Sequence, residues 1–300
     1  IVNALFGVDF SSKMSELSPA LGILLDDLGA MGCSQLNTPL EFSASGASRF
    51  NKALATVNEI VEHIISDHRQ FADDPSNLLS FLLSIRDDET GKPLTDTELR
   101  DEVVTQLIAG HETTSLVLSW AWYLLSKNSE AEARLHLELD KILGGREPDI
   151  TDLKQLPQAM MVLQESMRLY PAVWMQARKT LAAVDLEGIH IPDNSLVIVS
   201  PYAIHRHKSY WQNPEQFDPL RFSFEKKQVK FSYIPFGGGQ HLCVGQNLAL
   251  LEGLIIIAMI AQKFSVRPLA NHRVAPHPSI TLRLLDGLPA TLVRRNEEAA

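Results

Sequence analysis

The stretch from Thr95 to Ser126 constrains the fold of this chain more than any other. Thr95-Asp96-Thr97-Glu98 is a capping box, in which the Thr95 hydroxyl accepts from a backbone N–H and the Glu98 carboxylate reaches back. No proline occurs between Thr95 and Ser126. We therefore expect one long helix from about Asp96 to Ser126, around which the other elements must pack.

The rest of the chain divides into helical and strand-like parts. Helical spacing of apolar residues predicts helices around 14–30, 47–70, 77–87, 130–143 and 157–170, and a last long helix from about Gly245. Gly144-Gly145 ends one of them, and Pro157 suits the first turn of the next. Residues 177–206 carry short β-branched runs separated by turn residues, which predict small strands. The order of helices, strands and helix indicates a mainly α, α+β fold and not a doubly wound parallel sheet.

Composition excludes several classes of protein. The chain has 300 residues, a formal net charge of −9 and 45% hydrophobic residues, so it is globular and lacks the basic character of a nucleic-acid-binding protein. Two cysteines, Cys33 and Cys243, cannot build a disulfide framework and suit a reducing compartment. No run reaches the ~20 apolar residues of a membrane span. The start at Ile1, without methionine or leader, indicates a fragment, and an anchor upstream stays open.

Cys243 stands in the loop Phe236 to Gly245, which holds three consecutive glycines and leads into the last helix. The N-terminus of a helix offers free N–H groups and a partial positive charge, both of which stabilise a thiolate. Glycines at 237, 238, 239 and 245 permit positive φ and let the backbone approach a flat, bulky group. A buried structural cysteine is the plain alternative. A phosphate cradle fails because no G-K-[ST] follows, and a zinc site from Cys243, His241, His205 and His207 lacks paired spacing.

The pattern Phe236-x-x-Gly239-x-His241-x-Cys243-x-Gly245 closely resembles the haem-binding loop of the cytochrome P450 family. The resemblance implies that Cys243 is the fifth ligand of the haem iron and that the loop binds haem b. The cofactor-binding residues that it implies are Phe236, Gly237, His241, Gly245, Cys243, Arg178, Ala109 and Gly110. His241 stands where arginine is usual in the family, which weakens the inferred contact to a haem propionate.

Residues 109–115, Ala-Gly-His-Glu-Thr-Thr-Ser, lie in the middle of the long helix. Gly110 costs about 1 kcal/mol relative to alanine there, so a packing notch or a function must offset it. The stretch is not H-E-x-x-H, which excludes a zinc protease. In the family resemblance it is the oxygen-binding stretch: Ala109 and Gly110 leave room for dioxygen, and Glu112 and Thr113 are the catalytic pair that delivers protons. Thr113 can hydrogen-bond back to the Ala109 carbonyl.

Glu165 and Arg168 lie three residues apart on an apolar helix, so their burial requires partners. In the family resemblance they form a structural triad with Arg221, while Leu220 replaces a common glutamate and removes one ion pair. Arg178 is implied to contact a haem propionate. Ala109, Val173 and Trp174 are implied to line the substrate pocket.

The resemblance covers nearly the whole chain and implies one partial P450 catalytic domain over residues 1–300, without the family's N-terminal part. It implies a cytoplasmic haem-thiolate monooxygenase that inserts one atom of O₂ into a small apolar substrate. Electrons would come from NAD(P)H through a flavin reductase or a ferredoxin-type donor, separate or fused beyond Ala300. A peroxide-driven peroxygenase, a non-catalytic haem-binding protein and a haem-free helical scaffold are the alternatives.

Overall fold

The computed structural model describes residues 5–7, 11–34, 44–71, 77–225 and 228–295. The chain forms two compact units, residues 1–112 and residues 113–300, and each is described by itself. None of the helices within these ranges is long and apolar enough to cross a membrane.

Unit 1 is helical. It contains a 3₁₀ turn at Ser11–Lys13, α2 (Met14–Ser34), α3 (Ala44–Phe71), α4 (Leu78–Ser84) and the first part of α5 (Asp96–Ser126). Apolar side chains of α2, α3, α4 and α5 bury one another in a single core cluster. The predicted capping box is confirmed, because Thr95 N–H donates to Glu98 Oε2 at 2.8 Å and Glu98 N–H donates to Thr95 Oγ1 at 3.2 Å.

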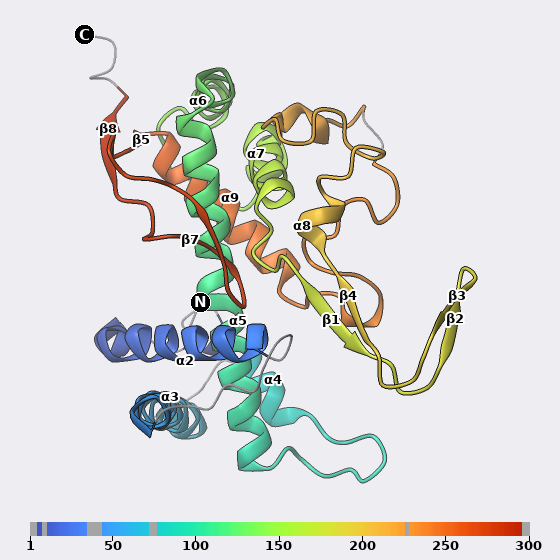
Figure 1. Ribbon diagram of the computed structural model, residues 1–300. Coiled ribbons are helices and arrows are strands. Elements are labelled where there is room, and N and C mark those ends of the chain that lie inside the picture. The colour runs from blue at the N-terminus through green and yellow to red at the C-terminus, as the bar shows by residue number, and fades with distance from the viewer. Residues whose placement is uncertain (1–4, 8–10, 35–43, 72–76, 226–227, 296–300) are drawn as a thin grey trace. The chain divides into compact units, whose positions relative to one another are not determined.

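Unit 2 surrounds α9 (Gln246–Ala261), a helix with apolar residues on every side. It packs with α6 (Ser129–Leu143), α7 (Pro157–Leu169), a 3₁₀ turn at Leu153–Gln155 and the second part of α5 (Figure 1). Gly253 lets α9 approach α7 closely, since a Cβ at this position would lie 3.0 Å from a methyl carbon of Leu163. The predicted stops are confirmed: α6 ends at Gly144, whose φ is +58°, and Pro157 occupies the first turn of α7.

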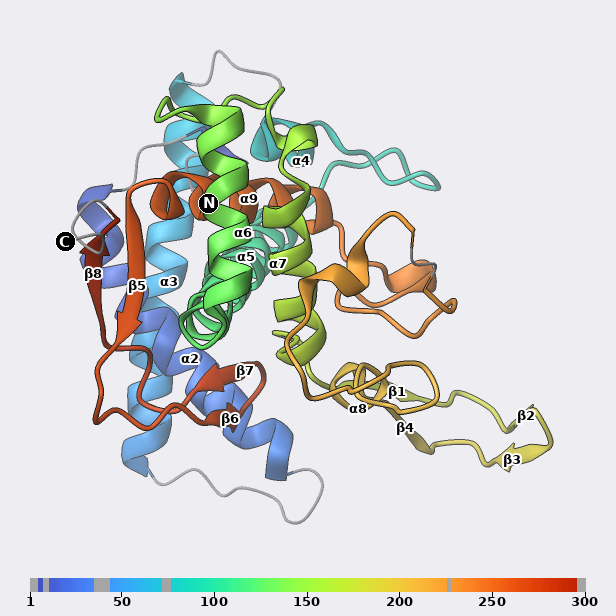
Figure 2. The same cartoon turned by 90° about the horizontal axis from the view of Figure 1, so that it is seen from above.

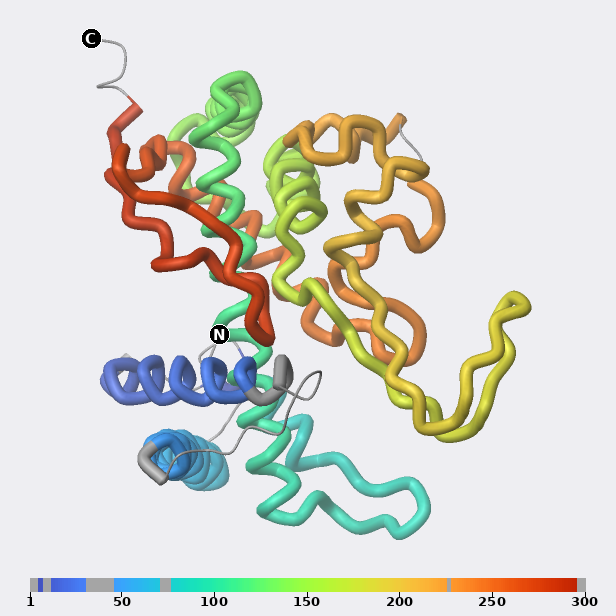
Figure 3. The backbone as a smooth tube through the Cα atoms, viewed as in Figure 1, coloured from blue at the N-terminus to red at the C-terminus, as the bar shows by residue number. Residues whose placement is uncertain are grey.

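The strands of unit 2 form four antiparallel pairs among the residues described. β1 (Gln176–Lys179) pairs with β4 (Leu196–Val199), and β2 (Val184–Leu186) pairs with β3 (Ile189–Ile191); Figure 3 traces these four strands as one long arm. After α9, β5 (Phe264–Pro268) pairs with β8 (Ala290–Arg294), and β6 (Pro276–Pro278) pairs with β7 (Leu282–Leu284), in red in Figure 2. The predicted mainly α, α+β fold with small sheets is confirmed.

One part of the strand-like stretch is wrongly predicted. Residues 201–204 form the short helix α8 (Pro201–Ile204) and not a strand or turn. Ser200 Oγ accepts the Ala203 N–H at 3.3 Å, and Pro201 supplies a φ suited to the first turn. This serine-proline start outweighs the β-branched character of the residues around it.

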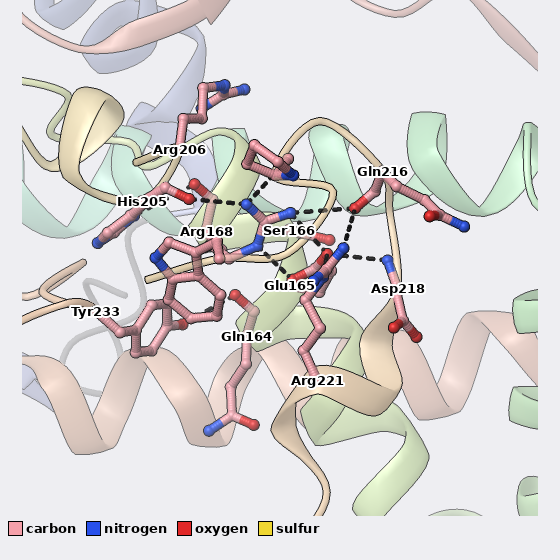
Figure 4. Close-up of polar contacts among 12 residues, drawn as sticks. Gln164, Glu165, Ser166, Arg168, His205, Arg206, Gln216, Asp218, Arg221 and Tyr233 are labelled. Carbon is pink, nitrogen blue, oxygen red and sulfur yellow. Dashed lines mark hydrogen bonds and ion pairs between the residues drawn. The ribbon is translucent and has the colours of Figure 1, made fainter. Parts of the chain in front are cut away.

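A buried carboxylate lies between α7 and the irregular chain that follows α8 (Figure 4). The Glu165 and Arg168 side chains are fully buried, and Arg168 donates through Nε to Glu165 Oε2 at 2.7 Å and through Nη2 to Oε1 at 2.8 Å. Arg168 Nη1 also donates to the carbonyl oxygens of His205 at 2.8 Å and Pro214 at 2.7 Å. One guanidinium group therefore joins α7 to two loops far away in the sequence.

Arg221, in a 3₁₀ turn at Pro219–Phe222, completes the predicted triad. Its Nε donates to Glu165 Oε1 at 3.3 Å, and its two terminal nitrogens donate to the Gln212 and Asn213 carbonyl oxygens. The Asp218 N–H donates to the same Glu165 oxygen at 2.9 Å. Burial raises the pKa of the Glu165 carboxyl above its ordinary value, while the two guanidinium groups oppose this by favouring the charged form.

His205 extends the network toward the cysteine loop. Its Nδ1 donates to the Arg168 carbonyl at 3.2 Å, and its Nε2 accepts the Ile234 N–H at 2.8 Å. This arrangement requires the neutral ring, and burial lowers the pKa of His205 to about 4. Tyr233, next to Ile234, donates to the Gln164 carbonyl at 2.9 Å. These bonds hold residues 233–234 against α7. The cysteine loop begins at Phe236, two residues after Ile234.

Replacing Glu165 by glutamine should destabilise unit 2 strongly. Two buried guanidinium groups would lose their counter-charge, a loss that costs about 3–5 kcal/mol when one member of a buried ion pair is removed. All four tryptophans lie after residue 112, so their fluorescence during urea unfolding reports this unit. Glu130→Gln, which breaks the exposed pair with Arg134, is the matched control and should cost about 0.5 kcal/mol or less. Equal losses in the two variants would contradict a structural triad.

Acid should weaken unit 2 through His205. The folded pKa is about 4 against an ordinary 6.5, so between these values only the unfolded chain takes up the proton. The stabilisation is complete above pH 6.5 and falls by about 3 kcal/mol as the pH drops through this window. His205→Gln should flatten the free energy of unfolding between pH 6.5 and 4, measured in urea, whereas His277→Gln at an exposed position should not. An unchanged slope in His205→Gln would refute this assignment.

Candidate functional site

Cys243 lies exposed immediately before α9. Its backbone N–H donates to the Phe236 carbonyl at 3.0 Å, which closes the loop of residues 236–243 into a compact turn. Gly245 is the N-cap of α9, and a Cβ built on it would lie 3.8 Å from Cys243 Sγ. The sulfur therefore lies beside the N-terminus of a sixteen-residue helix.

Only some of the loop glycines need their conformational freedom. Gly237 and Gly239 have φ of +76° and +70°, values that side chains rarely adopt. Gly238 has φ of −174° and Gly245 has φ of −81°, both open to other residues, so the expectation of positive φ at these two positions is wrong. At Gly245 the absence of a side chain instead keeps the space beside Sγ open.

The surroundings of the thiol fit a haem. Leu242 is 54% exposed and Val244 is 85% exposed, so two apolar side chains flank an accessible sulfur. Exposed aliphatic groups beside an exposed thiol suit contact with a flat apolar ligand. The donor set also fits, since a thiolate is a soft ligand that haem iron accepts.

The other predicted cofactor residues of unit 2 differ in their surroundings. Phe236 packs against the main core cluster, so it anchors the loop whatever else it contacts. His241 is exposed in a 3₁₀ turn at Gly239–His241. Arg178 is exposed on β1 opposite Val197, and its Nη1 donates to the Ala177 carbonyl at 2.8 Å. Contacts of His241 and Arg178 with a propionate stay predictions.

The zinc alternative fails on geometry. His205 uses both ring nitrogens within the buried network described above. Within the ranges that the structure describes, no three His, Cys, Asp or Glu side chains come close enough to hold a metal ion. Cys243 therefore lacks the protein partners of a tetrahedral zinc site.

The predicted oxygen-binding stretch lies in α5, which is helical throughout residues 109–115. The division between the two units falls between Glu112 and Thr113, inside this helix. His111 Nε2 and Ser18 Oγ of α2 lie 3.0 Å apart, so the histidine of this stretch contacts a neighbouring helix of unit 1. The assignments of Ala109, Gly110, Glu112 and Thr113 stay predictions.

The segment Ala172–Trp174 is fastened to the turn between β6 and β7. The Trp174 indole N–H donates to the Ser279 carbonyl at 2.9 Å, and the Leu282 N–H donates to the Ala172 carbonyl at 2.9 Å. On the other side, the buried Trp120 indole donates to the Leu282 carbonyl at 3.1 Å. Trp174 therefore fixes a turn, a contact that sequence reasoning missed. The expectation that Val173 and Trp174 line a substrate pocket with Ala109 stays a prediction.

Sequence reasoning also missed Gln176, whose side-chain amide lies against Gly237. The available signal was its spacing: Gln176 stands two residues before Arg178 in a strand, and such positions share one face.

Comparison with known proteins identifies relatives of this chain. The family model described as "Cytochrome P450" matches residues 1–285. "Cyclooctatin synthase" of Streptomyces melanosporofaciens is 35% identical over 283 residues, which cover 93% of this chain and 62% of that protein. "Cyclooctat-9-en-7-ol 5-monooxygenase" of the same organism is 37% identical over 264 residues, 87% of this chain and 57% of the relative. The chain spans about three-fifths of the length of these relatives.

The fold is shared with a solved structure. The crystal structure of the "cytochrome P450DA heme domain" matches with a TM-score of 0.85 and 27% identity, over 99% of this chain and 66% of that one. The helical fold with small sheets agrees with the family match over most of the sequence. The chain belongs to the cytochrome P450 family.

Proposed function

We propose that this protein is a haem-thiolate monooxygenase, which inserts one oxygen atom of O₂ into a small apolar substrate by hydroxylation or epoxidation. The observation that carries the proposal is the exposed Cys243 thiol at the N-terminus of α9, in a loop closed by its own backbone. One relative described above is named a "monooxygenase". A second, "Pentalenene oxygenase" of Streptomyces avermitilis, is 32% identical over 251 residues, which cover 80% of this chain and 56% of that one. Both names support the reaction class. Electrons would come from NAD(P)H through a flavin reductase or a ferredoxin-type donor.

Cys243, Phe236, Gly237, His241, Gly245 and Arg178 would hold the haem. Bound there, the haem would supply electron transfer and oxygen activation, which a thiolate ligand favours. The protein's own contribution begins with the loop. The Phe236 ring packs in the core and its carbonyl accepts the Cys243 N–H at 3.0 Å, so the sulfur is positioned before any ligand arrives.

Glu112 and Thr113 would deliver protons to the reacting oxygen. Thr113 Oγ1 would donate its proton toward the reacting oxygen and would be reprotonated by a water molecule. That water would receive its proton from the Glu112 carboxyl, which would take one up from solvent in turn. Ala109 and Gly110, one helical turn before Thr113, would leave space beside this hydroxyl. A peroxide-driven reaction would not need this pair.

Cys243→Ser should remove the thiolate signature. The reduced, carbon-monoxide-bound protein should lose the strongly red-shifted Soret band, because a serine oxygen is a harder and less electron-rich ligand. Turnover should fall at least a hundredfold. Cys33→Ser, at the other cysteine, is the control and should keep both. A serine variant with the native spectrum and turnover would refute the proposal.

Thr113→Ala should uncouple reductant use from product formation. Without the hydroxyl, proton delivery slows by about tenfold or more, while electrons still arrive. The measurement is product formed per NAD(P)H consumed, with a ferredoxin–reductase pair and a panel of alkenes and alkenols. Thr105→Ala is the matched control, since this exposed threonine donates to the Asp101 carbonyl one turn earlier in the same helix. Unchanged coupling in Thr113→Ala, together with efficient turnover on hydrogen peroxide, would favour a peroxygenase.

A further inference from the structure

The side-chain amide of Gln176 covers the glycine loop before Cys243. A Cβ added to Gly237 would lie 3.2 Å from Gln176 Nε2, 3.5 Å from its Oε1 and 3.5 Å from the His241 carbonyl oxygen. The amide thus occupies the place that a side chain at position 237 would take. The first residue of β1 is therefore in contact with the loop that carries the cysteine.

This contact identifies the face of β1 that meets the loop. Side chains two residues apart in a strand point to the same face, so Gln176 and Arg178 share the face of β1 that meets the loop. The opposite strand places Val199 and Val197 beside them, and neither can pair with an amide or a guanidinium side chain. A polar pair, one neutral and one cationic, is therefore presented at the edge of the cysteine loop.

The donors and the acceptor of the Gln176 side-chain amide are not used by the protein residues described. Among the residues described, no side chain or backbone group bonds to the Gln176 amide, and its atoms are not sealed from solvent. An amide nitrogen carries two donors, and a donor beside a cation suits a carboxylate.

We propose that Gln176 is a cofactor-binding residue, whose amide N–H donates to a haem propionate carboxylate beside Arg178. The inference rests on the proposed haem binding at Cys243. The rival explanation is that the amide only packs on Gly237 and supports the loop. The two explanations differ in what retains the haem: the N–H donors of the amide in the first, and only the volume of the side chain in the second.

Two substitutions of the haem-loaded protein separate these explanations. Q176L keeps the volume and removes the donors, and Q176E keeps the shape but places a negative charge beside a carboxylate. Haem release is measured as transfer to excess apomyoglobin. Q176L should release haem about tenfold faster than the wild type, the scale of a lost hydrogen bond to a charged group. Q176E should be faster still.

The control is Q155L, the same change at an exposed glutamine of the 3₁₀ turn at Leu153–Gln155, which should release haem at the wild-type rate. The reduced, carbon-monoxide-bound spectrum should keep its thiolate band in all variants. Wild-type release from Q176L overturns the inference, whatever Q176E does. Faster release accompanied by loss of the thiolate band also overturns it, in favour of loop support. A wild-type protein that binds no haem would instead refute the proposed function.

Discussion

The buried charge of Glu165 is the interaction on which the site depends. A carboxylate without solvent needs partners, and here it receives Arg168, Arg221 and the Asp218 N–H. The partners come from three segments: Arg168 lies in α7, Arg221 lies in the 3₁₀ turn at Pro219–Phe222, and Asp218 lies just before that turn. The irregular region between α8 and α9 is fixed by these polar contacts where regular secondary structure is sparse.

The network reaches the cysteine loop by a short chain of bonds. Arg168 donates to the His205 carbonyl and accepts from the His205 ring, and that ring accepts the Ile234 N–H. Ile234 stands two residues before Phe236, whose carbonyl binds the Cys243 N–H. Arginine suits the central position because its planar, forked donors serve two carboxylate oxygens and several carbonyls at once, which a lysine ammonium cannot do in one plane. Arg168→Lys would therefore not be a conservative change.

The sequence predicts local features well because local chemistry decides them. The capping box at Thr95, the stop at Gly144 and the start at Pro157 each depend on residues within one helical turn. Burial of Glu165 and Arg168 among apolar neighbours predicts that they need a partner, and the family resemblance implies Arg221, which the structure places beside Glu165.

Features that depend on distant partners were out of reach. Nothing near His205 in the sequence shows that its ring joins Arg168 to Ile234, and the sequence suggests only a weak zinc ligand there. The same holds for Trp174, whose acceptor Ser279 lies 105 residues away, and for Gln176 against Gly237. The strand pair β5–β8, whose partners are separated by the β6–β7 pair, likewise gives no short-range hairpin signal.

For Glu112 and Thr113, the geometry of the helix restricts how the two side chains can cooperate. Consecutive residues of an α-helix project about 100° apart, so the two side chains cannot face one another across a single hydrogen bond. If both serve one reaction, a water or a substrate group must join them. Ala109 shares a helix face with both residues, at spacings of three and four, whereas Gly110 shares a face with Thr113 and not with Glu112.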